Sequence, residues 1–173
     1  GPDDLGVWLD NSCKIGLGHT RLSIRDLSKK GAQPMFSSCK RYIIIYNGEI
    51  YDTKTTKLNL KKENIIFKSN TDTEILLESI SKFGLIESIK KTNGMFAFAL
   101  YDLHEKKLFL VRDRLGIKPL FYFEDKNNIV FASEIKSIKK FFNFKSSINI
   151  DALNSYLKFG FNRKNTSIFE KIN

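Results

Sequence analysis

The sequence Met95–Tyr101 (MFAFALY) is followed by a polar segment, Asp102–Lys106, and then by Lys107–Val111 (KLFLV). Short runs of aromatic and aliphatic residues on either side of a polar segment are typical of a β-hairpin. We therefore predict two antiparallel strands here. The same pattern recurs at Leu120–Phe123 and Ile129–Phe131, which predicts a second hairpin.

Two further strands are predicted nearer the N-terminus, at Ile15–Leu22 and Arg41–Tyr46, from their content of apolar and β-branched residues. Asn47-Gly48 follows the second of them directly. This dipeptide is a strong tight-turn signal, so we expect the chain to turn there.

A helix is predicted from Thr71 or Asp72, either of which can act as its N-cap, to the residue before Gly84. Other helices are predicted at Leu85–Lys91, from Glu134, and over Asp151–Phe159. The order is strands, helices, further strands and a helix. This order predicts an α+β fold in which helices cover antiparallel sheets.

The chain has 173 residues, of which 42% are hydrophobic and 28% charged, which is ordinary globular composition. No apolar run is long enough to span a membrane. The net charge of +10 comes mainly from lysines spread along the sequence, with the densest stretch at Lys136–Lys145. Nucleic-acid sites usually cluster their charge and favour arginine, so we expect neither a nucleic-acid nor a membrane partner.

Two cysteines, Cys13 and Cys39, cannot build a disulfide framework and fit a reducing cytoplasm, which is the predicted location. The motifs of zinc and nucleotide sites are absent from the sequence, so no metal site is predicted. His19 lies in an apolar strand and is interpreted as a core histidine. His104 lies in a polar turn and is expected to be exposed.

Polar residues at the ends of predicted elements are the candidate site: Arg21, the tripeptide Asn47-Gly48-Glu49, and Asp72. Singly, each has an ordinary explanation as a surface charge, a turn or a helix cap. Together they suit an α-amino acid that reacts at a side-chain carbonyl. A guanidinium can bind a carboxylate, two acidic groups can bind an ammonium, and an amide with a main-chain N–H can stabilise an oxyanion.

Seven sequence blocks occur in the order found in one known family. They are Gly18–Asp26 (GHTRLSIRD), Gly31–Pro34 (GAQP), Asn47–Tyr51 (NGEIY), Asn70–Glu74 (NTDTE), Gly94–Asp102 (GMFAFALYD), Arg112–Leu120 (RDRLGIKPL) and Ala132–Lys136 (ASEIK). This series resembles the class II glutamine amidotransferase (glutaminase) domain of glutamine-hydrolysing asparagine synthetases, and the resemblance covers nearly the whole chain.

The resemblance implies a four-layer αββα sandwich of two antiparallel sheets, the fold of the N-terminal-nucleophile hydrolases. It implies a glutamine amidotransferase type 2 domain over residues 1–150, and the start of a connection to a synthetase domain over residues 151–173. Relative to the family, the first strand, the first helix and the N-terminal cysteine nucleophile are expected to be missing. Neither Cys13 nor Cys39 matches that nucleophile, so these residues alone are expected not to hydrolyse glutamine.

The resemblance also implies a role for each site residue. Arg21 would hold the α-carboxylate of glutamine, and Asp72 with Glu49 would hold its α-ammonium. Asn47 and Gly48 would form the oxyanion hole. Further residues are expected to support the pocket and to pack the sheets: Leu22, Ile24 and Ile45.

The parent protein implied by the family makes asparagine from aspartate, using ammonia released from glutamine. This domain needs no cofactor for its part, whereas ATP and Mg²⁺ would bind to the synthetase domain. The expected partners are glutamine, the synthetase domain and, as a possible homodimer, a second copy. Two alternatives stay open: a catalytically silent binding or structural domain of the same fold, and an amidotransferase with another ammonia acceptor.

Overall fold

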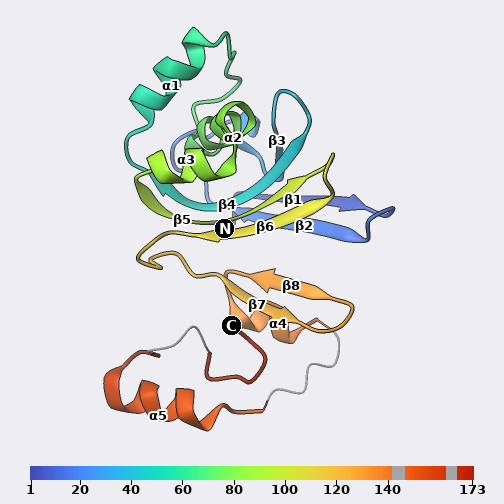
Figure 1. Ribbon diagram of the computed structural model, residues 1–173, viewed down its shortest axis with the longest axis vertical. Helices are drawn as coiled ribbons and strands as arrows, with labels where there is room; N and C mark the ends of the chain where they lie inside the picture. The colour runs from blue at the N-terminus through green and yellow to red at the C-terminus, as the bar shows by residue number, and fades with distance from the viewer. Residues whose placement is uncertain (142–146, 163–166) are drawn as a thin grey trace. The chain divides into compact units, whose positions relative to one another are not determined.

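A computed structural model of the chain describes residues 1–141, 147–162 and 167–173 (Figure 1). They form two compact units, Gly1–Lys118 and Pro119–Asn173. Part of the lysine-rich stretch 136–145 lies outside the described residues. The domain boundary after residue 150 stays a prediction, but the last segment shares a compact unit with the second hairpin.

The first unit is built on a four-stranded antiparallel sheet with the strand order β3-β4-β5-β6. Its strands are β3 (Met35–Phe36), β4 (Tyr42–Ile50), β5 (Gly94–Asp102) and β6 (Lys107–Arg112). The hairpin of β5 and β6 is the one predicted from MFAFALY and KLFLV. The central strand β5 has both neighbours and is buried along nearly its whole length, which explains why its sequence is almost continuously apolar.

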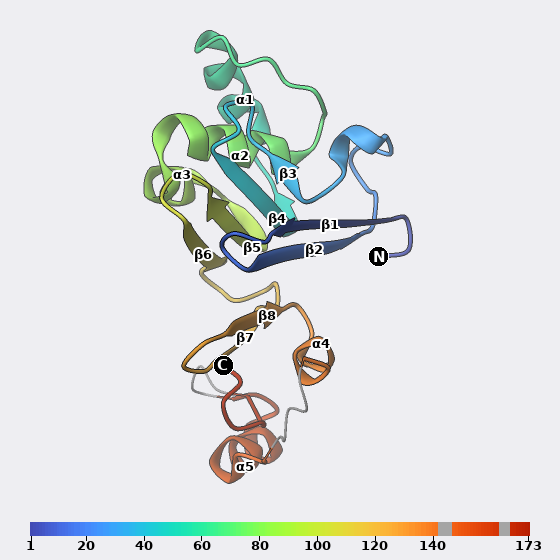
Figure 2. The same cartoon turned by 90° about the vertical axis from the view of Figure 1, so that its right-hand side faces the viewer.

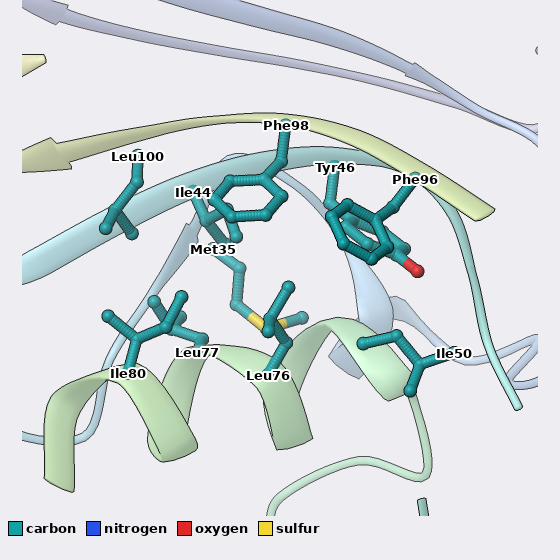
Figure 3. Close-up of a cluster of buried hydrophobic side chains, with 10 residues drawn as sticks. All are labelled: Met35, Ile44, Tyr46, Ile50, Leu76, Leu77, Ile80, Phe96, Phe98 and Leu100. Carbon is teal, nitrogen blue, oxygen red and sulfur yellow. The ribbon is translucent and has the colours of Figure 1, made fainter. Parts of the chain in front are cut away.

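Helices lie on one side of this sheet: α2 (Asp72–Phe83) and α3 (Leu85–Lys91) pack against it, and α1 (Thr53–Lys62) contacts α2. The Thr71 side chain caps α2 by accepting a hydrogen bond from the Glu74 N–H at 3.2 Å, and Gly84 ends the helix with a φ of 83°. Apolar side chains of α2 pack against β4 and β5 (Figure 3). This core consists of Met35, Ile44, Tyr46, Ile50, Leu76, Leu77, Ile80, Phe96, Phe98 and Leu100.

A hairpin of β1 (Asp4–Asp10) and β2 (Ile15–Arg21) packs on the opposite face of the sheet (Figures 1 and 2). Trp8 of β1 contacts the rings of Phe36 and Tyr101, and Leu17 of β2 is 1% exposed. Helices, sheet and hairpin therefore form three successive layers. The α+β class with packed antiparallel sheets is confirmed, and the described residues of this unit supply no helix on the outer face of the hairpin.

The second unit contains β7 (Phe121–Glu124) and β8 (Ile129–Ala132), which form the second predicted hairpin. The short helix α4 (Ile135–Lys139) contacts both strands, and Ile138 is its buried residue. The helix α5 (Ile150–Phe159) confirms the helix predicted over residues 151–159. The C-terminal residue Asn173 pairs with Tyr122, so the end of the chain is joined to β7.

Three elements differ from the sequence-based expectations. The tight turn predicted at Asn47-Gly48 is wrong, because β4 continues through both residues to Ile50 and pairs with β5 throughout. The strand β1 and the helix α1 were not predicted. The helix α1 is largely polar and buries only Leu60, and β1 (DLGVWLD) alternates partly buried and exposed residues without alternating polar and apolar ones.

Candidate functional site

The candidate site lies along one edge of β4. The Tyr46 N–H donates to Gln33 Oε1 at 2.6 Å and the Ile50 N–H donates to Asp72 Oδ2 at 2.9 Å, so both point away from β5. In an antiparallel strand the direction of the main-chain groups alternates from residue to residue, so the N–H of Gly48 points to the same edge. The short strand β3 pairs with β4 at Ile43 and Ile44, so it does not reach the edge beside Gly48.

Asp72, the first residue of α2, is 7% exposed and closes one end of this edge. Its carboxylate accepts hydrogen bonds from the Ile50 N–H at 2.9 Å, the Tyr46 hydroxyl at 3.1 Å and the Thr73 N–H at 3.1 Å. Burial, together with the negative charge of Asp72, raises the pKa of Tyr46, so the phenol stays protonated and donates. These hydrogen bonds hold Asp72, which is predicted to bind the α-ammonium, beside β4, which carries the predicted oxyanion donors.

Arg21, the last residue of β2, is also 7% exposed. Its Nη1 donates to the main-chain oxygen of Ser28 at 2.8 Å, and its Nη2 donates to that of Asp26. A Cβ at Gly31 would lie 2.3 Å from Nη2 and 2.8 Å from Thr71, so the guanidinium lies beside the N-cap of α2. Among the described residues, Arg21 forms no ion pair with a carboxylate.

Glu49 and Asn47 are on the face of β4 that the hairpin covers, because side chains alternate along a strand and Ile50 faces the helices. Both side chains are partly buried. Glu49 accepts a hydrogen bond from Arg25 Nη2 at 2.8 Å, and the same nitrogen donates to the main-chain oxygen of Ile50 at 2.9 Å. The structure therefore brings the predicted carboxylate-, ammonium- and oxyanion-binding residues to the region between β2, the end of β4 and the start of α2.

The packing role predicted for Leu22 and Ile24 is wrong. Their side chains are 61% and 76% exposed, because β2 ends at Arg21 and the chain has left the sheet before these residues. Ile45 is partly buried within β4, on the same face as Asn47, where it can support the site.

Gln33 and His19 also contact the site, although sequence reasoning did not assign them there. Gln33 is 9% exposed, and its Nε2 donates to Thr73 Oγ1 at 3.4 Å while its Oε1 holds Tyr46. The His19 Nε2 lies 3.1 Å from the Tyr46 carbonyl oxygen, to which it must donate because a carbonyl only accepts. Burial lowers the pKa of His19, and its Nδ1 is buried without a partner. Both residues lie in sequence blocks shared with the family, His19 in Gly18–Asp26 and Gln33 in Gly31–Pro34. This position in the sequence is the signal that could have identified them.

Neither cysteine is near this region. Cys13 lies in the turn between β1 and β2, at the opposite end of β2 from Arg21, which is roughly 20 Å of extended strand away. Cys39 lies before the start of β4, near Ser37 and Ser81, and is separated from Gly48 by a similar length of strand.

One cavity in the first unit has a volume of about 470 Å³ and includes none of the predicted site residues. It is lined by Lys57, Lys61, Ile65, Ile66, Phe67, Lys68, Ser69 and Asn70. In the described parts of the chain, histidine, cysteine and acidic residues form no group of three or more that could hold a metal ion. Within the same residues, every helix is too short or too polar to cross a lipid bilayer.

Comparison with known proteins places these observations in a family. The model of the glutamine amidotransferase domain family matches residues 1–173. Asparagine synthetase (glutamine-hydrolysing) 3 of Bacillus subtilis is 37% identical, over 99% of this chain and 28% of its own length. Asparagine synthetase (glutamine-hydrolysing) 2 of the same organism is 43% identical, over 80% of this chain and 18% of its own length. The chain spans about a third or less of the length of the curated relatives it matches.

The fold has a counterpart among solved structures. A glutamine phosphoribosylpyrophosphate amidotransferase from Bacillus subtilis superposes with a TM-score of 0.61 and 24% sequence identity, over 72% of this chain and 28% of that one. At this identity the likeness concerns the fold, and it agrees with the α+β architecture described above. The family match over residues 1–173 establishes that this chain belongs to the glutamine amidotransferase domain family.

Proposed function

We propose that the chain binds L-glutamine as the glutaminase part of a glutamine-hydrolysing asparagine synthetase. The observation that carries this proposal is Arg21. Its guanidinium is buried beside the start of α2, and its partners in the described structure are main-chain carbonyl oxygens. A buried guanidinium gains most from a carboxylate partner, which it can bind through two parallel hydrogen bonds. The α-carboxylate of glutamine would be that partner.

The α-ammonium of glutamine would lie beside negatively charged side chains. Asp72 and Glu49 would bind the α-ammonium, and the side chain of glutamine would then extend along the edge of β4. Its amide oxygen would be met by the Gly48 N–H and the Asn47 side chain. A nucleophile attacking that amide pushes negative charge onto the oxygen, and such donors stabilise the charge. Water completes the hydrolysis, which yields glutamate and ammonia.

In the proposed parent protein, this ammonia would amidate aspartate to asparagine in a reaction driven by ATP with Mg²⁺, both bound by a fused synthetase domain. A cytoplasmic location and a homodimer belong to the same proposal. Several relatives that match most of this chain carry the name asparagine synthetase. These names support aspartate as the ammonia acceptor. A silent binding domain, or another ammonia acceptor, is the alternative.

Calorimetric titration of the 173-residue chain with L-glutamine tests the proposal. We expect saturable binding with one site. Replacement Arg21→Ala should weaken it by at least about tenfold, because a charge-assisted hydrogen bond contributes roughly 1.5–3 kcal/mol.

Arg114→Ala is the matched control. Arg114 also donates to main-chain carbonyl oxygens, those of Ile89, Lys90 and Thr92, but it does so at the end of α3. Its replacement should leave glutamine affinity unchanged. Equal affinity of the Arg21→Ala variant and the unsubstituted chain would show that the carboxylate site is assigned to the wrong residue.

A further inference from the structure

A cationic side chain of the protein itself lies among the proposed ammonium ligands. Arg25 Nη2 donates to Glu49 Oε1 at 2.8 Å and to the Ile50 carbonyl oxygen at 2.9 Å. The N–H of the same residue, Ile50, donates to Asp72 at 2.9 Å. Glu49, the Ile50 main chain and Asp72 are therefore contiguous, and the guanidinium lies on them.

Electrostatics agree with this placement. The hydrogen bond that Arg25 donates to Glu49, and the charges of Asp72 and Glu49, raise the pKa of Arg25 above its ordinary value. Both carboxylates thus act on one guanidinium, which is the environment proposed for the α-ammonium of the substrate. An ammonium has three N–H donors and needs acceptors for them. Glu49 Oε1 and the Ile50 oxygen, two acceptors at this position, are already used by Arg25.

Arg25 is also placed where it can move aside. It lies in the segment between β2 and Lys29, in which Leu22, Ile24 and Leu27 are exposed. The Arg25 and Glu49 side chains are themselves 30% and 41% exposed. Ion pairs with this much exposure are weak, because water screens the charges and solvates them when they separate.

We propose that the Arg25 guanidinium competes with the α-ammonium of glutamine for Glu49 and the Ile50 carbonyl, so that Arg25 lowers the affinity of the site for ligands with an α-ammonium. The inference rests on the proposed function, since it takes the site to bind an amino acid. It assigns to Arg25 a role in setting affinity, opposite in sign to that of Arg21. Arg21 would attract the α-carboxylate of the substrate, whereas Arg25 occupies the position proposed for its α-ammonium.

The test compares two ligands that differ only at the α-carbon. One is L-glutamine, and the other is glutaramate (5-amino-5-oxopentanoate), which lacks the α-ammonium. Dissociation constants are measured by calorimetry for the chain and for Arg25→Gln, which keeps a polar side chain without the charge. The Arg25→Gln variant should bind glutamine about two- to fivefold more tightly, the range expected for breaking an exposed ion pair. Its affinity for glutaramate should be unchanged, because that ligand has no group that displaces Arg25.

Arg114→Gln is the matched control and should alter neither dissociation constant. A second measurement follows the Nε–H signal of Arg25 by NMR, which should shift on addition of glutamine and stay in place with glutaramate. Unchanged or weaker glutamine binding by Arg25→Gln overturns the inference while leaving the proposed function intact, provided that Arg21→Ala still loses binding. Weaker binding of both ligands would instead make Arg25 a second carboxylate ligand. Failure of the unsubstituted chain to bind glutamine would overturn the proposed function and this inference together.

Discussion

Gly48 leaves no room for a side chain within β4. A Cβ added there would lie 2.3 Å from the Met95 carbonyl oxygen and 2.6 Å from the Phe96 Cα, both of which are main-chain atoms of the neighbouring strand. Main-chain atoms in a paired strand cannot rotate out of the way as a side chain can. The glycine is therefore required by the close approach of β4 and β5, at the residue whose N–H is proposed to stabilise the oxyanion.

We predict that Gly48→Ala lowers the free energy of unfolding by about 1–3 kcal/mol, the usual cost of overpacking. Urea denaturation measures this change. Gly18→Ala is the matched control in β2, where the nearest atom to an added Cβ is 4.0 Å away. It should be neutral or stabilise by up to about 1 kcal/mol. Equal effects of the two substitutions would contradict the crowding argument.

Arg21, Gly48 and Asp72 were selected from the sequence for the groups they offer to an amino acid, and the structure brings them to one region. Their roles in binding stay predictions. The contacts of Gln33 and His19 with Tyr46 could not be anticipated, because they join segments that are distant in the sequence and depend on how the hairpin lies on the sheet.

At the scale of elements, strong periodicity was a reliable guide and local turn propensity was not. The hairpin of β5 and β6 and the helix α2 follow from runs of buried apolar residues. Asn47-Gly48 has the composition of a tight turn, yet pairing with Ala97 and Phe96 of β5 keeps it extended. Tertiary pairing outweighs a two-residue preference, as it commonly does in strands.

His19 links the β1–β2 hairpin to the sheet through its hydrogen bond to the Tyr46 carbonyl oxygen. Burial lowers its pKa, so the unfolded chain takes up a proton at a higher pH than the folded chain does. As pH falls through the ordinary value of 6.5, the unfolded state binds more protons, and the free energy of unfolding decreases. We predict lower stability at about pH 5.5 than at about pH 7.5.

Urea denaturation at the two pH values checks this expectation. His19→Gln, which retains a donor for the Tyr46 carbonyl, should reduce the difference between them. His104→Gln removes the other histidine from an exposed turn and should leave the difference as it is. A difference that persists in full after His19→Gln would show that another group causes it.

At the scale of the whole molecule, the outer face of the hairpin carries a row of exposed apolar side chains. Leu5, Val7 and Leu9 lie on one face of β1 and are 70%, 64% and 65% exposed. Opposite Val7 and Leu9 are Gly18 and Gly16, which offer no side chains to cover them. A row of apolar residues over small ones favours contact with another surface, and the net charge of +10 opposes it.

We therefore predict that the chain associates with itself more strongly as salt concentration rises, because salt screens the repulsion between like-charged copies. Sedimentation velocity at low and high salt measures the association. Val7→Lys should suppress it. Leu58→Lys is the control, since Leu58 is 60% exposed but lies on the polar helix α1. Suppression by both variants alike would attribute association to added charge rather than to the hairpin face.

The register between β4 and β5 also sets when the site can exist during synthesis. Gly48 pairs with Phe96, so the strand that carries the proposed oxyanion donor waits for about fifty further residues before its partner is made. At ribosomal rates of roughly 5–20 residues per second, that wait lasts on the order of 2–10 s. From the synthesis of Asp72 onward the chain contains both Arg21 and Asp72, but the sheet that the proposed glutamine site needs is still incomplete. The proposed glutamine site can therefore form only late in synthesis, once β5 has paired with β4.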